Sequence, residues 1–204
     1  MPRTKRTGSV LPYGSLDREH LVKHLLELAR RVGVENVTMR ALASEAGTSP
    51  SSVYYHVRDK AALLDLLTDS VLGGIEIPAA GGWQQRIADL YTNAWHAMID
   101  MPGIAALLQQ RPLAGTADAL DRSVRDILTE SGWPADDVAS AHVVLYIHLL
   151  GSVQLQHHLR LSGADRDAER LFQQGLRVIL AGLQHREDPR HRDLQHRDGG
   201  PPPA

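Results

Sequence analysis

Cysteine is absent from the 204 residues, which excludes disulfides, thiolate metal sites and cysteine nucleophiles. The chain also lacks any run of about 18 apolar residues, the length that a membrane-spanning helix needs. The N-terminus carries Arg3, Lys5 and Arg6 and has no apolar signal region. These absences predict a soluble, cytoplasmic protein that makes no contact with a membrane.

The sequence features of common enzymes and metal sites are missing as well. There is no Gly-x-Ser-x-Gly elbow, no phosphate-binding loop and no pair of carboxylates on an apolar face. His157 and His158 cannot share a helix face with each other, and no Asp or Glu occurs from residue 143 to residue 160. We therefore expect neither an enzyme nor a bound metal or other cofactor.

An excess of one charge is lacking over the whole chain, whose formal net charge is −2. The charges are nevertheless distributed unevenly. Residues 1–65 hold ten Lys and Arg against seven Asp and Glu, whereas the remainder holds twelve against seventeen. Because phosphate contacts require basic side chains, this distribution favours the first third of the chain as a nucleic-acid-binding part.

Residues 38–60 carry the most informative pattern in the chain. Thr38 is a residue of the N-cap type, and Gly47 follows an apolar stripe at the position where glycine commonly ends a helix. Ser49 can cap a second helix, with Pro50 as its first residue. Two short helices joined by a turn that contains glycine predict a helix-turn-helix, whose second helix lies in the DNA major groove.

Apolar residues recur at helical spacing elsewhere, and no strand-like alternation is visible, so the expected fold class is all-α. The other expected helices cover residues 16–32, 60–72, 83–100, 104–109, 117–131, 134–161 and 165–183. The expected organisation is a flexible basic arm over residues 1–14, an N-terminal helix-turn-helix DNA-binding domain over residues 15–72, a linker over residues 73–82, a C-terminal helical ligand-binding and dimerisation domain over residues 83–184 and a disordered tail over residues 185–204.

The last two expected helices are long and carry broad apolar stripes. Their predicted dimer-forming residues are Val143, Ile147, Leu150, Gln154 and the pair Gly151-Ser152 on one helix, and Leu171, Leu176, Ile179, Leu180 and Leu183 on the other. Such helices expose more apolar surface than one small domain can cover. We expect a homodimer in which a four-helix bundle buries this surface and presents two recognition helices to a palindromic operator.

Several spaced motifs resemble the DNA-binding domain of the TetR family of bacterial transcriptional regulators. They are Gly33-Val-Glu-Asn-Val-Thr-Met-Arg40, Ala41-Leu-Ala-x-x-Ala-Gly47, and Val53-Tyr-Tyr-His56 followed by Lys60-Ala-Ala-Leu-Leu-Asp65. The resemblance implies contacts with double-stranded DNA from nine residues. These are Thr38 and Arg40, then Pro50, Ser51 and Ser52 at the bases, Tyr54, Tyr55 and His56 at phosphates and thymine methyls, and Lys60 at a phosphate.

Each of these residues also has an ordinary structural interpretation. Arg40 has the shape to bridge guanine O6 and N7, but it is equally suited to be a solvated surface charge. Thr38 can cap its helix and contact DNA at once. Aromatic residues of small helical domains usually pack, so we expect one of Tyr54 and Tyr55 to belong to the core.

The C-terminal half resembles the tetracycline repressor subgroup more loosely, through Gly82-Trp83-Gln84, Arg111-Pro112 and Phe172-x-x-Gly-Leu-x-x-Ile-Leu-x-Gly-Leu183. Leu107 and Leu155 stand where that subgroup has its magnesium-coordinating histidine and a nearby carboxylate. Since leucine cannot ligate a hard cation, a tetracycline–magnesium effector is rejected. We expect a small, mainly apolar effector, whose candidate contacts, each also suited to the core, are Trp83, Trp95, Met98, Leu107, Leu108, Arg111, Tyr146 and His148.

These observations predict a ligand-responsive transcriptional repressor that binds its operator as a homodimer and is released by a small molecule. Two alternatives stay open. The first is a DNA-binding regulator that responds to a protein partner instead of a small ligand. The second is a helical small-molecule binding protein without DNA binding, against which Arg40, His56 and Lys60 argue.

Overall fold

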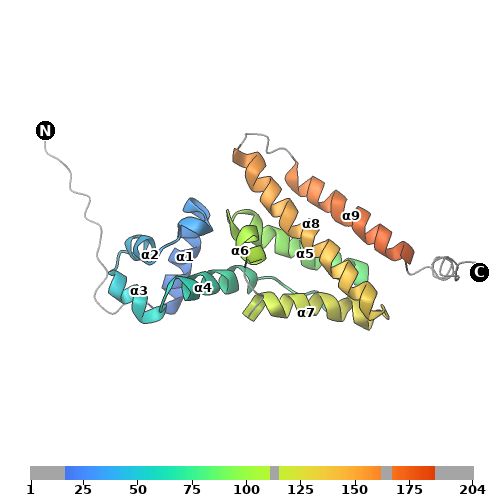
Figure 1. The fold of residues 1–204 in the computed structure, drawn as a ribbon, viewed down its shortest axis with the longest axis horizontal. Coiled ribbons are helices and arrows are strands. Elements are labelled where there is room, and N and C mark those ends of the chain that lie inside the picture. Colours follow the sequence, from blue (N-terminus) through green and yellow to red (C-terminus); the bar gives the residue numbers. More distant parts are fainter. Residues whose placement is uncertain (1–16, 111–114, 162–166, 187–204) are drawn as a thin grey trace, which may run out of the picture. The chain divides into compact units, whose positions relative to one another are not determined.

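The computed structural model describes residues 17–110, 115–161 and 167–186, and all of its regular elements in these ranges are helices (Figure 1). The all-α prediction is confirmed. The first elements are α1 (Arg18–Val32), the 3-10 helix η1 (Val34–Asn36), α2 (Met39–Glu45), α3 (Pro50–His56) and α4 (Lys60–Leu72). They are followed by α5 (Trp83–Ile99), α6 (Ile104–Gln110), α7 (Gly115–Glu130), α8 (Ala135–Leu161) and α9 (Ala168–Arg186).

The ends of the predicted helices differ from the observed ends by a few residues. The prediction missed η1, and α9 begins three residues later than expected and continues to Arg186. His185 was assigned to the tail but belongs to this helix. The predicted arm over residues 1–14, Arg111 and the tail from residue 187 lie outside the described residues.

The chain forms two compact units, and the second half of α5 returns to the first of them. The first unit comprises residues 1–76 and 93–121, and the second comprises residues 77–92 and 122–204. The chain first passes between the units within the predicted linker over residues 73–82. The helices α6 and part of α7 belong to the same unit as α1–α4, which the sequence pattern did not reveal. The predicted domain limits stay a prediction.

The core of the first unit is an apolar cluster shared by α1–α4. It contains fully buried leucines and one valine, namely Leu21, Leu25, Leu42, Val53, Leu63 and Leu67. Asp17 caps α1, because its Oδ1 accepts a hydrogen bond from the His20 backbone N–H at 2.8 Å. This hydrogen bond holds the pKa of the Asp17 carboxyl below its usual range.

Two polar contacts join α1–α4 to the later helices of the same unit. The backbone N–H of Val34 donates to the Pro102 carbonyl at 2.8 Å. Asp69, on α4, accepts a hydrogen bond from the Thr116 backbone N–H at 3.0 Å, so its carboxylate lies at the N-terminal turn of α7. These contacts hold α4 and η1 against α6 and the beginning of α7.

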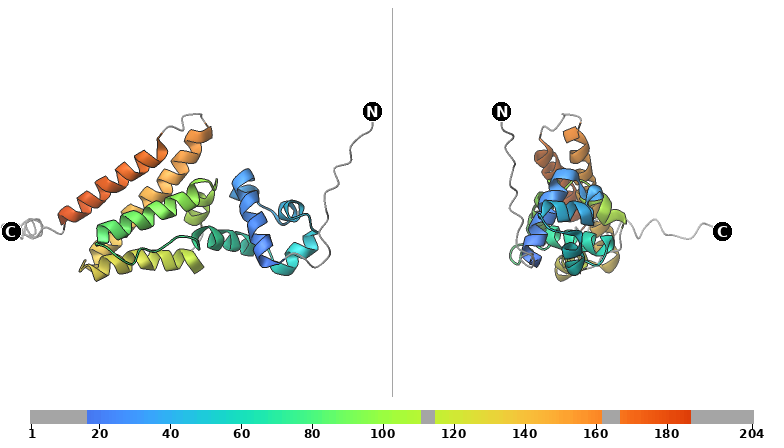
Figure 2. Two further views of the ribbon diagram at one scale, coloured as in Figure 1. Left: turned by 180° about the vertical axis from the view of Figure 1, so that it is seen from behind. Right: turned by 90° about the vertical axis from the view of Figure 1, so that its left-hand side faces the viewer.

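In the second unit, α8 and α9 run antiparallel and side by side (Figures 1 and 2). The buried side of α9 consists of Phe172, Leu176, Leu180 and Leu183. Leu150 is buried on α8 as well. The prediction that Leu150, Leu176, Leu180 and Leu183 face a second copy is therefore wrong, because they already pack within one chain.

Within the described residues, α8 is also long and apolar enough to cross a membrane by length and composition. About two-fifths of its most apolar window is nevertheless buried inside the molecule (39% in the structure). One such helix is weak evidence of a membrane span, because the core helices of soluble proteins share this length and composition.

Candidate functional site

Three side-chain caps fix where the helices of the candidate nucleic-acid interface begin. Thr38 Oγ1 accepts a hydrogen bond from the Ala41 backbone N–H at 3.1 Å. Ser49 Oγ accepts one from the Ser52 N–H at 3.3 Å, and Asp59 Oδ1 accepts one from the Ala62 N–H at 2.8 Å. The caps predicted at Thr38 and Ser49 are confirmed, and they hold the first turns of α2 and α3 in place.

The turn between α2 and α3 depends on one glycine. Gly47 has a φ of +61°, in the left-handed region that side chains with a Cβ rarely adopt. The next residue, Thr48, donates its backbone N–H to the Ala43 carbonyl at 2.9 Å, which closes the end of α2. The predicted helix-turn-helix is therefore present.

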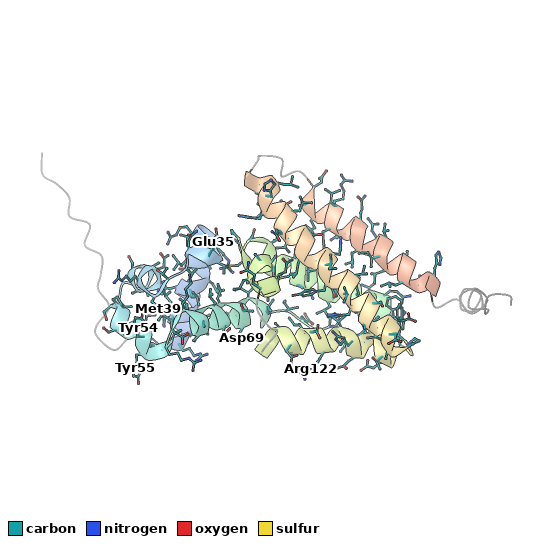
Figure 3. All side chains as sticks on the ribbon, viewed as in Figure 1. Glu35, Met39, Tyr54, Tyr55, Asp69 and Arg122 are labelled. Carbon is teal, nitrogen blue, oxygen red and sulfur yellow. The ribbon has the colours of Figure 1, made fainter. Side chains whose placement is uncertain are left out.

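The two faces of α3 differ sharply. Val53 and Val57 are buried, whereas Tyr54 is 53% exposed and Tyr55 is 87% exposed. Both tyrosines point away from the core (Figure 3). The expectation that one of them packs inside is wrong, because Val53 on the inner side of this short helix and Val57 directly after it already fill the adjacent core. Two phenol rings are thus left for an external partner.

The other predicted contact residues of α3 surround these rings. Pro50 and Ser51 are exposed on the first turn, and the half-buried Ser52 has its Oγ 3.0 Å from Ser49 Oγ. The half-buried ring of His56 meets the Tyr55 ring edge to face, with the centroids 5.2 Å apart. This arrangement offers hydroxyl, imidazole and phenol groups, which contact bases and phosphates well.

Two cations lie on neighbouring helix starts. Arg40 is exposed in the first turn of α2, next to the exposed cap Thr38. Lys60 is exposed at the first residue of α4, and its Nζ donates to the Glu35 carbonyl of η1 at 3.4 Å. That contact steadies Lys60 beside the N-terminal amides of α4, where an anion such as phosphate is favoured.

Sequence reasoning missed one cation at this interface. Arg58 lies between α3 and α4, two residues before Lys60, and its side chain is 85% exposed. Its Nε lies 3.3 Å from a carboxylate oxygen of the cap Asp59. The position of Arg58 two residues before Lys60 in the sequence is the signal that could have identified it.

Comparison with known proteins agrees with this geometry. The family described as bacterial regulatory proteins, tetR family, matches residues 21–67. An HTH-type transcriptional regulator of Saccharopolyspora erythraea is 30% identical over 200 residues, covering 82% of this chain and 84% of the relative. The chain belongs to the TetR family. It is a DNA-binding transcriptional regulator and not an enzyme.

Other members of the TetR family are similar over most of their length. The class D tetracycline repressor of Escherichia coli is 30% identical over 158 residues, covering 75% of this chain and 72% of the repressor. Streptomyces coelicolor ActR in complex with actinorhodin superposes with a TM-score of 0.71 at 21% identity, covering 87% of this chain and 99% of ActR. A TetR variant of Acinetobacter baumannii in complex with minocycline gives a TM-score of 0.69 at 22% identity, with 83% and 97% covered. These two structures show the common fold.

The residues expected to contact an effector in this TetR-family chain divide between the two units. Trp95, Met98 and Leu108 are buried and Leu107 is half-buried in the first unit. Trp83, Tyr146 and His148 belong to the second unit. Arg111 lies outside the described residues.

Trp83 and His148 each have a packing contact that explains their position. The Trp83 ring meets Trp133 edge to face, with the centroids 5.1 Å apart. The His148 ring lies parallel to Phe172 with the centroids 5.2 Å apart, and His148 Nε2 lies 3.0 Å from the Phe172 carbonyl oxygen. A Cβ on Gly175 would lie only 2.4 Å from the His148 ring. These contacts support the packing interpretation of both residues.

The resemblance to the tetracycline repressor subgroup placed Leu107 and Leu155 at its metal-binding positions. Leu107 is half-buried and Leu155 is exposed. Among the described residues, no group of three or more His, Asp or Glu side chains is placed to hold a metal ion.

Proposed function

We propose that this TetR-family regulator acts in the cytoplasm as a homodimeric repressor, which binds a palindromic operator and is released by a small, mainly apolar effector. The observation that supports operator binding best is the exposed polar face formed by α2, α3 and the beginning of α4. All the predicted contact residues that lie on it are exposed or half-buried.

In this proposal α3 enters the major groove. Pro50, Ser51 and Ser52 approach the base edges, and Arg40 bridges the O6 and N7 atoms of one guanine. Tyr54, Tyr55 and His56 contact phosphates and thymine methyl groups. Lys60 and Thr38 contact phosphates at the ends of their helices and fix the orientation of α3.

The proposed dimer uses the apolar side chains that α8 and α9 leave exposed. We call this surface the outer α8–α9 face, and its large apolar members are Val143, Val144, Ile147, Leu155, Leu171 and Val178. Ile147 is 63% exposed and Val178 is 72% exposed, although both stand in long, well-formed helices. A second copy would remove this surface from water and bring two α3 helices to one palindromic site.

The proposed effector contacts are Trp95, Met98, Leu107 and Leu108 of the first unit, and Tyr146 of the second unit stays a separate candidate. Trp83, His148 and Arg111 are omitted, the first two because of the packing contacts described above. ActR and the Acinetobacter TetR variant were each solved with a bound small molecule, actinorhodin and minocycline respectively. Release follows if the effector binds more tightly to the conformation that the operator does not accept, which shifts the population of dimers.

Selection of bound duplexes from a random pool tests the proposal. The expected product is a palindromic site whose retardation in a gel weakens steeply as the salt concentration rises. A library of hydrophobic compounds is then screened for release of that site. Selection of a site without any twofold symmetry would contradict the dimer. If no compound releases the regulator from the duplex but a protein from a cell extract does, the result would favour a regulator that responds to a protein partner.

A further inference from the structure

The corner between α3 and α4 carries two cations and one carboxylate at three consecutive positions. The side chain of Arg58 is 85% exposed and that of Asp59 is 52% exposed. Lys60 is exposed as well. The corner directly follows α3 in the chain, so it adjoins the face that is proposed to bind DNA. A phosphate that approaches this corner therefore meets charges of both signs.

The two oxygens of the Asp59 carboxylate have different partners. Oδ1 accepts the hydrogen bond from the Ala62 backbone N–H at 2.8 Å that caps α4. Oδ2 lies 3.3 Å from Arg58 Nε. An ion pair as exposed as this one contributes little to stability. Asparagine and serine cap helices about as well as aspartate does, so the cap does not need the negative charge.

We propose that Arg58 exchanges its ion pair with Asp59 for a DNA phosphate when the operator binds, and that the Asp59 charge lowers the affinity for the operator. The inference rests on the proposed function, because it requires that the exposed face of α2–α4 meets DNA. The contact with Asp59 is made at Nε, whereas a phosphate can accept two parallel N–H bonds from one guanidinium. The phosphate is therefore the better partner for this exposed arginine.

The Asp59 charge opposes operator binding in two ways. The attraction between Asp59 and Arg58 is lost when the phosphate takes the place of the carboxylate. The cap then keeps the carboxylate at the corner, where it repels the phosphate. Both effects act at an exposed position, so salt should weaken them. Lys60 differs, because its Nζ donates to the neutral Glu35 carbonyl and gives up no opposite charge when it contacts DNA.

The operator affinity of the full-length protein tests the inference, with the duplex taken from the selection described above. Asp59→Asn keeps the cap and removes the charge, so it should bind the duplex about three- to tenfold more tightly at low salt. This gain should shrink as the salt concentration rises. Arg58→Gln should bind about fivefold more weakly and lower the salt slope by about one. An unchanged affinity in either variant overturns the inference.

Combining the two substitutions tests the exchange itself. Without Arg58 there is no ion pair to lose, so adding Asp59→Asn to Arg58→Gln should raise the affinity by only about twofold or less. An equal gain with and without Arg58 would show that the carboxylate merely repels the phosphate, and the exchange would be refuted.

Asp126→Asn is the matched control, because it removes the same charge from an exposed residue of α7 in the second unit. Its operator affinity should stay within about 1.5-fold of the wild type, and a gain equal to that of Asp59→Asn would overturn the inference. Unfolding midpoints separate the charge of Asp59 from its cap. Asp59→Asn should keep the wild-type midpoint, whereas Asp59→Ala should lower it. If Asp59→Asn fails to fold, Asp59→Ser replaces it.

Failure of the proposed function gives a different result from failure of this inference. In the first case the wild type retards no selected duplex, and both are refuted together. In the second case the wild type retards the palindromic duplex, but Asp59→Asn and Asp59→Ser bind it no more tightly, and only the inference is refuted.

Discussion

The α2–α4 region and the α8–α9 hairpin are both helical, but they present opposite kinds of surface. The helices α2 and α3 are seven residues long, and side-chain caps at Thr38, Ser49 and Asp59 start α2, α3 and α4. Their exposed face is polar and rich in hydrogen-bonding groups. The helix α8 has 27 residues and exposes valine and isoleucine side chains along its outer side.

The difference shows two ways of forming an interface. In α2–α4, local hydrogen bonds fix the backbone so that polar side chains are held in place before DNA arrives. In the hairpin, length and packing fix the helices, and the proposed dimer interface is the apolar strip that one chain leaves uncovered. Substitutions on the exposed face of α2–α4 should lower the affinity for DNA without lowering the stability of the protein. Charged substitutions on the outer α8–α9 face should instead prevent dimer formation.

The largest effect is expected from charge on the outer α8–α9 face. The double variant Ile147→Asp with Val178→Asp should sediment as a monomer and bind the operator about 100-fold more weakly or worse, because one half-site supplies too few contacts. Its helix content should stay near that of the wild type. Leu176→Asp, at a buried position of α9, should instead unfold the protein. A double variant that stays dimeric would refute the outer face as the interface.

A smaller effect is expected at the DNA-contacting side chains. Arg40→Ala should cost roughly 1–3 kcal/mol of binding and relax the preference at one base pair per half-site. Lys60→Ala should weaken all duplexes about equally and reduce the salt slope by about one. Unfolding midpoints should not change, since both side chains are exposed. If Arg40→Ala selects the same site as the wild type, Arg40 does not contact a base.

The packing of the hairpin predicts different results at two glycines of α9. Gly175→Ala should lower the stability by about 1–2 kcal/mol, because the new methyl group meets the His148 ring. Gly182→Ala should be neutral or stabilising by up to about 1 kcal/mol, since nothing lies within 4 Å of its Cβ position. Denaturant unfolding at one protein concentration measures both changes. Removing the ring with His148→Ala should abolish most of the cost at Gly175, and an unchanged cost would show another cause.

The smallest effect is expected at the cap of α2. Thr38→Ala should lower the stability by about 1 kcal/mol, because the Ala41 N–H loses its acceptor. Thr38→Ser keeps the hydroxyl and should retain most of the stability. Denaturant unfolding provides the measurement, and equal losses in both variants would show that the methyl group, and not the cap, stabilises the helix.

Features fixed by neighbouring residues could be predicted from the sequence. The caps at Thr38 and Ser49 and the glycine at position 47 each involve partners within about five residues, so the spacing of residue types contains them. The exposure of both Tyr54 and Tyr55 could not be predicted, because only one side of the short helix α3 is buried, and Val53 and Val57 occupy the core there. The ends of α9 at Ala168 and Arg186 could not be predicted either, because helix ends depend on packing as well as on the local sequence.

The sequence by itself determined the all-α fold, the helix-turn-helix and the family, because these follow from local periodicity, caps and a string of matching residues. Only the tertiary structure decided which apolar side chains of α8 and α9 stay exposed. Leucines on both sides of these helices look alike in sequence, and the contacts between α8 and α9 bury Leu176 and Leu180 while Ile147 and Val178 stay exposed. The meeting of Arg125 and His142 was decided in the same way, since residues 17 positions apart come together only when α7 packs on α8.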